Sequence, residues 1–339
     1  MNAYLEYDPD VFKGKVILLP CDDPEWSNFT KYFAQNFERF GIKKLISTSY
    51  AADSKQKGTP YQPSLFEMND PKFDEAKTRA RGKIFILEKD NNKSGKIDID
   101  DIEWDYLDGD GDFKSDEIKK IRDESDMIIT NPPFSLFREF LGWIMESGKQ
   151  FSIIGGMNAI TYKEVFPLIK NNTIWLGNGF NHGNAYFRPA SVERNYANGV
   201  YDDNTNLVKF RNCVWYTNID HGRRHQPLAL MTMEDNLKFS KHKIIREKGY
   251  LKYDNYDAIE VPFTDAIPSD YKEGMGVPIS FLEKYNPDQF KIERFRKGDD
   301  GKDLAYTDLA SKQASKQASK QASKQITPYF RIIIRRKEV

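Results

Sequence analysis

The most constraining feature of the sequence is an apolar stretch that runs directly into two prolines. Residues 126–130 read Asp-Met-Ile-Ile-Thr, and Asn131-Pro132-Pro133-Phe134 follow at once. Proline has no backbone N–H, and it biases the residue before it towards extended geometry. The two prolines therefore predict a strand that ends in a rigid turn. That turn directs the Asn131 side chain and the carbonyls of Asn131 and Pro132 away from the strand end.

Short apolar strands alternate with amphipathic helices through the first half of the chain. Strands are predicted at 15–20, 44–49, 83–87, 126–130 and 151–156, with helices at 26–37 and 136–144 between them. This alternation is typical of an α/β fold with a parallel sheet covered on both faces. Ligands of such folds bind beyond the carboxyl ends of the strands, where Cys21–Pro24 and Asn131–Phe134 stand.

The Asn131 corner has the polar groups to bind an exocyclic amine. Such an amine donates two hydrogens, and an amide oxygen with a backbone carbonyl can accept both. The nitrogen lone pair is then left for an electrophile, while Phe134 offers a face on which a planar base can stack. A proline-stiffened loop without chemistry is the alternative. The strand before the corner and the helix after it favour a site.

Asn131-Pro132-Pro133-Phe134 resembles the catalytic (D/N)PP(Y/F) motif of amino-group methyltransferases that use S-adenosylmethionine. With Gly109–Phe113 upstream and Ser135–Glu139 downstream, the segment resembles the EcoRI-type adenine-N6 DNA methyltransferase family. Further stretches similar to that family are 20–29, 214–218 and 276–282. The resemblance implies a class I S-adenosylmethionine-dependent methyltransferase fold. This fold is Rossmann-like, with a mostly parallel sheet, helices on both faces and an irregular C-terminal target-recognition region.

The same resemblance implies where S-adenosylmethionine binds, namely over the first two strands. The residues implied are Cys21, Asp22, Asp23, Ser27, Asn28, Asp112 and Phe113. Asp112 would read the cofactor's adenine amine and Phe113 would pack its ring against the base. The usual FxGxG loop is missing, and a solvated acidic loop is the alternative for Asp112. Family members also begin with a Lys-Asp-Glu-Phe-Tyr-Thr-Gln-like segment against the cofactor, so we expect either a truncated start or a substitute element.

The implied reaction is methyl transfer to N6 of a flipped-out adenine at a specific sequence of double-stranded DNA. The catalytic residues would be Asn131, Pro132, Pro133 and Phe134, without a metal. DNA contacts would come from Trp215, Tyr216, Arg223, Arg224 and His225. Core packing is the alternative for the two aromatic residues, and a surface loop is the alternative for the basic cluster. We expect a monomer. The enzyme would either accompany a restriction endonuclease that acts on the same site without stable binding, or be an orphan modification enzyme, and the sequence leaves both open.

Two other functions stay open at this point. The same motif serves enzymes that methylate a protein glutamine or an RNA base. A truncated, catalytically silent DNA-binding or cofactor-binding remnant is the second alternative. The chain has equal acids and bases, 51 of each, which argues against general polyanion binding. Basic stretches at 209–252 and 291–339 could form a local phosphate-facing surface, but taken alone they are better interpreted as ordinary solvated faces.

Composition and spacing limit the remaining possibilities. The sequence has no long apolar run for a membrane span, no signal peptide, and two cysteines without zinc spacing, so we expect a cytoplasmic protein. Residues 90–101 partly match an EF-hand loop, but a solvated loop is favoured.

The sequence also predicts how the chain is divided. We expect a methyltransferase catalytic domain at 1–175 and the remaining sheet with the DNA-recognition region at 176–309. An Ala-Ser-Lys-Gln repeat at 310–325 would be disordered or a marginal helix, and a basic strand would occupy 326–339.

Overall fold

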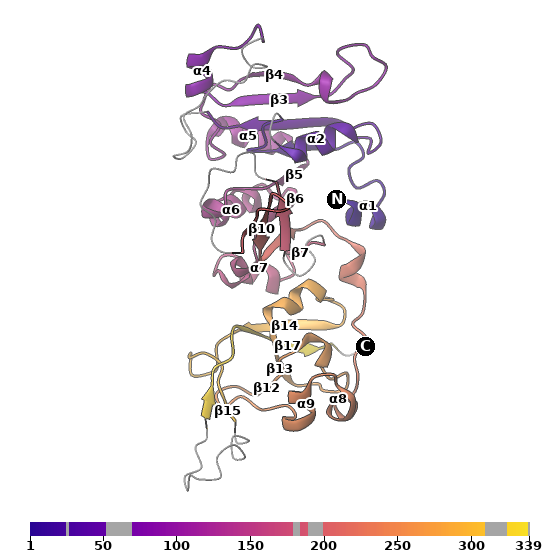
Figure 1. Cartoon of the computed structure of the whole chain (residues 1–339), viewed down its shortest axis with the longest axis vertical. Coiled ribbons are helices and arrows are strands. Elements are labelled where there is room, and N and C mark those ends of the chain that lie inside the picture. The colour runs from indigo at the N-terminus through magenta and orange to yellow at the C-terminus, as the bar shows by residue number, and fades with distance from the viewer. Residues whose placement is uncertain (25–26, 52–69, 179–183, 189–198, 309–323, 338–339) are drawn as a thin grey trace. The chain divides into compact units, whose positions relative to one another are not determined.

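The computed structural model describes residues 1–24, 27–51, 70–178, 184–188, 199–308 and 324–337 (Figure 1). The chain forms two compact units. Unit 1 comprises Met1–Met157 and Gly177–Asp220, and unit 2 comprises Asn158–Leu176 and His221–Val339. Most of the Ala-Ser-Lys-Gln repeat lies outside the described residues.

A twisted mixed sheet forms the centre of unit 1. Its strands in this unit run in the order β4-β3-β2-β1-β5-β6-β11. In chain order they are β1 Val16–Leu19, β2 Lys44–Ser49, β3 Lys83–Leu87, β4 Glu103–Tyr106, β5 Met127–Thr130, β6 Gln150–Gly156 and β11 Cys213–Thr217. The four strands β2-β1-β5-β6 are parallel to one another, while β3, β4 and β11 pair antiparallel with their neighbours.

Helices flank these strands (Figure 1). They are α1 Asn2–Tyr7, α2 Asn28–Gln35, α4 Glu75–Ala80, α5 Asp116–Glu124 and α6 Phe137–Ser147. Helix α2 begins at Asn28 because the Ser27 hydroxyl accepts from the backbone N–H groups of Phe29 and Thr30. A small antiparallel sheet of β8 Asn184–Phe187, β10 Leu207–Arg211 and β9 Tyr201–Asp202 completes the unit.

The core of unit 1 explains why α2 lies against the sheet. Phe33 and Phe37 pack with buried strand residues that include Ile17, Leu19 and Met127. Each large apolar side chain that is fully buried in this core stabilises the folded unit by roughly 1.5–3 kcal/mol.

The predicted α/β fold is confirmed, and all five predicted strands are present. The expectation of a parallel arrangement is wrong for β3, which pairs antiparallel with β2. An apolar run looks the same in either direction, so its periodicity does not fix the sense of pairing. Strand β4 was not predicted, because its acidic residues Glu103 and Asp105 made an edge strand resemble a loop.

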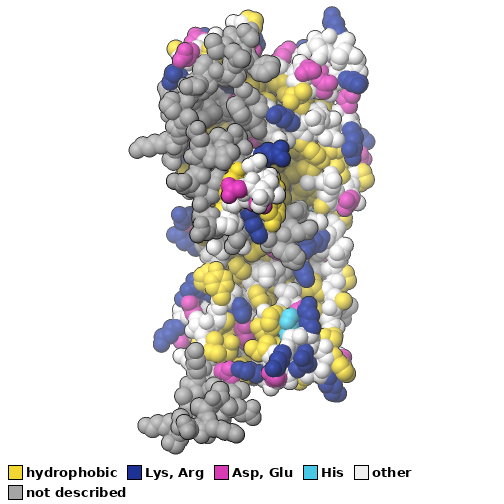
Figure 2. Space-filling model, in the orientation of Figure 1, with side chains coloured by type: hydrophobic (Ala, Val, Ile, Leu, Met, Phe, Trp, Pro, Cys, Tyr) yellow, Lys and Arg dark blue, Asp and Glu magenta, His cyan; other side chains and the backbone are white. Residues whose placement is uncertain are grey.

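Unit 2 is built around a sheet in the order β12-β13-β17-β14. These strands are β12 Ala258–Glu260, β13 Gly274–Pro278, β14 Phe290–Phe295 and β17 Arg331–Arg336, and β15 Tyr306–Asp308 pairs with β16 Lys324–Ile326. The unit also has the strand β7 Trp175–Leu176 and the helices α7 Phe166–Lys170, α8 Met233–Phe239 and α9 Lys243–Lys248. Figure 2 shows basic and apolar side chains next to one another where Figure 1 labels α8 and α9. In the described parts of the chain, every helix is too short or too polar to cross a bilayer.

Candidate active site

A cavity of about 600 Å³ opens at the carboxyl ends of the parallel strands of unit 1. It is lined by residues from the ends of β1, β2 and β5 and from β6 and β11. These residues are Cys21, Asp23, Ser49, Tyr50, Asn131, Pro132, Pro133, Phe134, Ile154 and Cys213. The volume falls within the range of about 300–1,000 Å³ that small-molecule sites occupy.

The Asn131–Phe134 corner forms one wall of this cavity. Thr130, the last residue of β5, is fully buried, and the chain then turns outward so that Asn131 is exposed. Pro132 is buried, and Pro133 leads into a short 3-10 helix, η3 Phe134–Leu136, that precedes α6. Phe134 is 47% exposed although it is a large apolar side chain. The corner therefore places an amide, two proline-constrained peptides and an uncovered ring at one cavity.

Residues that follow β1 and β2 form the facing wall. Cys21 adopts a left-handed backbone conformation, with φ of 67°, which turns the chain sharply after the strand. Burial raises the pKa of the Cys21 thiol to about 12, and the charges of Asp22 and Asp112 act in the same direction. The thiol therefore keeps its proton at physiological pH, which disfavours it as a nucleophile. Burial also raises the pKa of Tyr50, so its hydroxyl keeps its proton.

Asp22 lies beneath the wall and does not line the cavity. Its side chain is buried, Ser27 Oγ donates to Oδ1 at 2.7 Å, and Thr130 Oγ1 lies 2.5 Å from Oδ2. Burial raises the pKa of Asp22 to about 6, while the hydrogen bonds from Thr130 and Ser27 oppose this rise. Asn28 is exposed at the first position of α2, outside the cavity lining.

The loop that carries Asp112 and Phe113 packs against the end of β2. Gly111 has φ of 87°, and a side chain there would overlap the Ser49 carbonyl oxygen. The Asp112 charge raises the pKa of both Cys21 and Tyr50, so this carboxylate acts on the cavity wall. Phe113 is 1% exposed. Its ring packs in the core against Phe140 and Trp143, with centroid distances of 5.0 and 5.7 Å, and not along the cavity.

Of the two aromatic residues expected at DNA, Tyr216 lies in the core and Trp215 is partly exposed. Tyr216 is fully buried, packs against Phe137 and donates its hydroxyl hydrogen to the Gly156 carbonyl at 2.8 Å. Trp215 is half-buried and its ring meets Phe29 edge-on at 5.8 Å. Neither residue lines the cavity. Tyr216 in particular has no surface to offer to DNA, so the expectation of a DNA contact is corrected to core packing.

The predicted basic cluster after β11 contains one buried residue, Arg224, and one exposed residue, His225. Arg224 is buried, with its guanidinium carbon 3.7 Å from the Trp175 ring centroid and a hydrogen bond to Asn172. This packing corrects Arg224 to a structural residue of unit 2. His225 is exposed, and its Nδ1 lies 3.9 Å from a carboxylate oxygen of Asp288.

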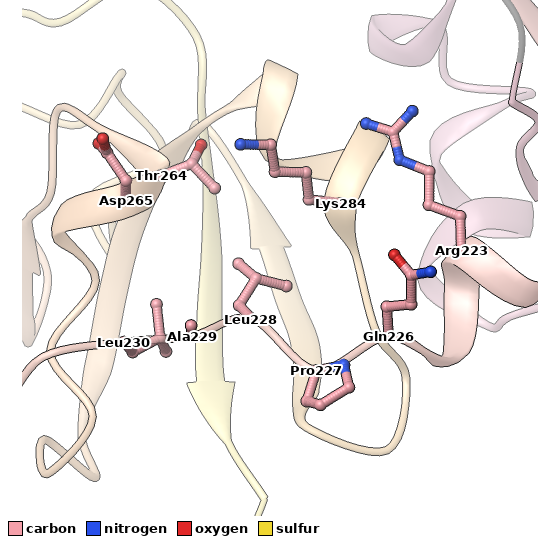
Figure 3. Close-up of a pocket in the computed structure, with 9 residues that line it drawn as sticks. All are labelled: Arg223, Gln226, Pro227, Leu228, Ala229, Leu230, Thr264, Asp265 and Lys284. Carbon is pink, nitrogen blue, oxygen red and sulfur yellow. The ribbon is translucent and has the colours of Figure 1, made fainter.

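Arg223 lines a second cavity, of about 320 Å³, which lies within unit 2 (Figure 3). Lys284, at the end of the 3-10 helix η8 Ile279–Lys284, faces the same space and supplies a second cation. The lining consists of Arg223, Gln226, Pro227, Leu228, Ala229, Leu230, Thr264, Asp265 and Lys284. The Asp265 carboxylate is itself paired, at 2.7 Å from both Lys241 Nζ and His242 Nε2. The cavity therefore has a basic side and an apolar floor.

Four cavity residues of unit 1 were not predicted from the sequence, namely Ser49, Tyr50, Ile154 and Cys213. A signal existed for Tyr50, because it directly follows the predicted strand 44–49 and thus stands at a carboxyl end. No comparable signal marked Ile154 or Cys213. Both belong to strands whose apolar residues serve the core equally well.

The loop at 90–101 uses its carboxylates internally. Asp90 accepts from the backbone N–H groups of Ser94 and Gly95, and Asp101 accepts from those of Asn91, Asn92 and Asp98. These bonds lower the pKa of Asp101. In the part of the chain that the structure describes, no group of three or more histidines, cysteines or carboxylates is arranged to hold a metal ion.

Known proteins resemble the chain over nearly its whole length. A model of the family described as "Adenine-specific methyltransferase EcoRI" matches residues 1–337. The Type II methyltransferase M.EcoRI of Escherichia coli is 40% identical over 337 residues, which is 99% of this chain and 90% of that protein. M.MpnI of Mycoplasma pneumoniae is 32% identical over 292 residues, which cover 84% of this chain and 76% of that protein. M.MgeORF184P of Mycoplasma genitalium is 30% identical over 300 residues, 86% and 78% of the two chains.

No solved structure matches the chain. The family match over residues 1–337 agrees with the cavity at the Asn-Pro-Pro-Phe corner and with the α/β sheet that holds it. The chain belongs to the EcoRI family of adenine-specific methyltransferases.

Proposed function

We propose that the protein transfers the methyl group of S-adenosylmethionine to N6 of an adenine that has left the stack of double-stranded DNA. The observation that carries this proposal is the single cavity shared by the Asn131–Phe134 corner and by the residues after β1 and β2. A substrate amine at the corner and a methyl donor over the strand ends would meet there. Holding two reactants in register is where most of the rate of such a transfer comes from.

The residues of the facing wall fit the proposed cofactor. S-adenosylmethionine has a cationic sulfonium and a cationic ammonium, and Asp23 and Asp112 provide negative charge at or near the wall. Ser49 and Tyr50 add polar groups, while Ile154 supplies an apolar surface. We assign Cys21 to packing of this wall, and Asp22, Ser27 and Phe113 to its support. When bound, the cofactor supplies an activated methyl group whose leaving group is a neutral thioether.

Asn131 and Pro132 act on the adenine amine. The lone pair of this amine is delocalised into the ring, which makes it a weak nucleophile. The Asn131 side-chain oxygen and a backbone carbonyl of the corner would accept its two hydrogens, favour a pyramidal nitrogen and stabilise the positive charge that develops there. The two prolines fix these acceptors in place before the substrate arrives.

Phe134 would hold the flipped base. The target amine is unreachable in a stacked duplex, and turning the base out costs a few kcal/mol. A stacking contact with an aromatic side chain offsets about 1–3 kcal/mol of that cost. The 47% exposure of Phe134 leaves the ring available for this contact.

The cavity of unit 2 is proposed to contact the DNA backbone. Arg223 and Lys284 both line it, and cations of this kind bind phosphate oxygens. Phosphate contacts position the DNA but carry no sequence information, so other contacts must recognise the target sequence. We further propose that the protein acts as a monomer.

The first test is Asn131→Ala. We expect this variant to lose methyl transfer by about 100-fold or more, the loss typical of removing one preorganised group that stabilises developing charge. Binding of S-adenosylmethionine should persist, because the cofactor wall is unchanged. Transfer of a radiolabelled methyl group and calorimetric titration measure the two properties separately.

The control is Asn204→Ala, at an exposed asparagine in the turn between β9 and β10. It should transfer at the wild-type rate. DNA, RNA and protein are offered to the enzyme in parallel. If the radiolabel enters RNA or protein and not DNA, the substrate is that molecule and the proposal of a DNA substrate is wrong. Full activity of Asn131→Ala would overturn the assignment, and wild-type protein that shows no heat on titration would indicate a silent remnant.

A further inference from the structure

Three close oxygen contacts join the segment after β1 to the end of β5 and to the start of α2, next to residues that line the cavity of unit 1. Thr130 Oγ1, at the end of β5, lies 2.6 Å from the Pro20 carbonyl oxygen and 2.5 Å from Asp22 Oδ2. On the other side of the same carboxyl group, Ser27 Oγ lies 2.7 Å from Oδ1. Thr130 is fully buried and Asp22 is 6% exposed, so water has little access to these contacts.

Counting hydrogens shows that one is missing if Asp22 is ionised. The Ser27 hydroxyl has one hydrogen, which it donates to Asp22 Oδ1. The Thr130 hydroxyl also has one, but two acceptors lie within hydrogen-bond distance, Pro20 O and Asp22 Oδ2. A buried pair of oxygens at this separation without a hydrogen between them is repulsive. A proton on Asp22 Oδ2 supplies the missing hydrogen. Asp22 then donates to Thr130 Oγ1, and Thr130 donates to the Pro20 carbonyl.

We propose that Asp22 is a positioning residue that works as a neutral carboxylic acid, fastening the loop after β1 to Thr130 beside Asn131. This inference goes beyond the proposed function, because it gives Asp22 a role other than contact with the cofactor. Of its two tests below, only the kinetic one rests on the proposed function. Burial raises the pKa of Asp22 to about 6, so the neutral acid of this proposal predominates below about pH 6 and is lost as the pH rises through that value.

Among the residues that the structure describes, the hydroxyl groups packed against Asp22 from β2 and α2 contact its backbone carbonyl and not its carboxyl group. From β2, Ser47 Oγ donates to the Asp22 backbone carbonyl, and from α2, Thr30 Oγ1 donates to the same carbonyl at 3.0 Å. The titratable and charged groups on this side are the neighbouring Cys21 and Asp23, and Asp112 and Tyr50 around Cys21. Burial raises the pKa of Cys21 and of Tyr50, so both groups keep their own protons.

The consequence for the site is mechanical. Asp22 joins three elements that contribute to the cavity wall: the end of β1, the N-terminus of α2 through Ser27, and the last residue of β5. Thr130 is bonded directly to Asn131. The distance between the amine-binding corner and the facing wall therefore depends on this acid–hydroxyl contact.

The test uses Asp22→Asn, which mimics the neutral acid. Its Nδ2 can donate to Thr130 while its Oδ1 accepts from Ser27. A group whose folded-state pKa is raised contributes stability below its unfolded value and loses it as the pH rises through the folded value. Across about pH 4 to 7, the unfolding midpoint of Asp22→Asn should therefore rise relative to the wild type, and the difference should level off above that range. This measurement needs neither cofactor nor DNA.

Asp101→Asn is the matched control, because the pKa of Asp101 is lowered by backbone hydrogen bonds. The stability that a lowered pKa contributes is gained below the ordinary value of 3.8, so the midpoint of this control relative to the wild type should stay level across about pH 4 to 7. For Asp22→Asn, a difference that stays flat across that range, as in the control, or that falls with rising pH, would overturn the proposal.

Kinetics provide the second arm. Asp22→Asn should keep a higher kcat than Asp22→Ala, and its kcat relative to wild type should rise with pH. Thr130→Val should lower kcat by up to about 100-fold through misplacement of Asn131, with KM for the cofactor changing less, and Thr130→Ser should restore it. If Asp22→Asn is as inactive as Asp22→Ala, the negative charge of Asp22 is needed and the positioning role is wrong. If the wild type transfers no methyl group, the proposed function fails while the stability test still decides this inference.

Discussion

At the scale of single residues, the exposed ring of Phe134 is the least expected feature of the site. It is 47% exposed beside buried Pro132 and Thr130, so the fold itself gains little from it. We propose that a planar ligand covers this apolar side chain during the reaction.

Phe134→Ala should therefore lower kcat/KM for DNA by about 5- to 150-fold, the equivalent of the roughly 1–3 kcal/mol that one stacked base contributes. Phe134→Trp should retain most of the activity, because the indole also stacks. Steady-state methyl transfer measures both. Tyr7→Ala is the control, since Tyr7 in α1 is 46% exposed and lies outside the cavity lining. An equal loss in the control, or none in Phe134→Ala, would remove the stacking role.

The sequence indicates which residues stand at strand ends but not which side chains are covered by distant segments. Asn131 and Cys21 line the cavity because each follows a parallel strand, which the local pattern already implied. Phe113, Tyr216 and Arg224 read as site residues, yet they are buried by Phe140, Phe137 and Trp175 respectively. Aromatic rings and guanidinium groups suit both a core and a binding surface. Only the tertiary partner decides between the two.

At the scale of elements, the loop that carries Asp112 is held against β2 by a glycine. Gly111 has a positive φ, and any side chain there would overlap the Ser49 carbonyl oxygen. The backbone N–H of Ala51 also donates to the Asp110 carbonyl at 2.8 Å. The close approach of two backbones therefore places Asp112 near the cavity wall.

Gly111→Ala should displace this loop and weaken binding of S-adenosylmethionine as well as lower the unfolding midpoint. Gly95→Ala is the control. Gly95 has a similar φ of 85° but open space around it, so this variant has the backbone strain of Gly111→Ala without the steric overlap. That control should lose only about 1–2 kcal/mol from the left-handed conformation and should bind cofactor normally. Calorimetric titration of both variants decides, and equal cofactor affinity in the two would contradict the positioning of Asp112 by this loop.

The element pattern predicted from the sequence was right where strands are buried and parallel. β1, β2, β5 and β6 are short apolar runs in the centre of the sheet, and their periodicity and length identify them. The side of the sheet that ends in β4 was harder to predict. β3 lies between β2 and β4, and its apolar run did not reveal that it is antiparallel to β2. β4 is the edge strand and alternates acidic with aromatic residues, because an edge strand is covered on fewer sides and its sequence is less restricted.

At the scale of the whole molecule, the chemistry is assigned to unit 1 and a DNA-backbone contact to unit 2. The chain carries no net charge, so general attraction to a polyanion is weak and binding depends on local basic groups. Arg223 and Lys284 at the cavity of Figure 3 are such groups.

Arg223→Ala and Lys284→Ala should each weaken DNA binding almost equally for all sequences. Each should reduce the slope of log K against log salt by about 1, the effect of one lost phosphate contact. Titration of labelled duplex DNA at several salt concentrations measures the slope. Lys272→Ala, an exposed lysine of the same unit outside the cavity lining, serves as the control. An unchanged slope in both cavity variants would place the backbone contact on another surface.

The most direct measurement is to map modified bases in DNA from cells that express the protein and have no adenine methylation of their own. Long-read sequencing detects N6-methyladenine at single-base resolution together with its sequence context. The account predicts N6-methyladenine at one recurrent sequence, which is absent from cells without the protein. Folded, expressed protein that leaves every adenine unmodified, or that modifies cytosine instead, would contradict it.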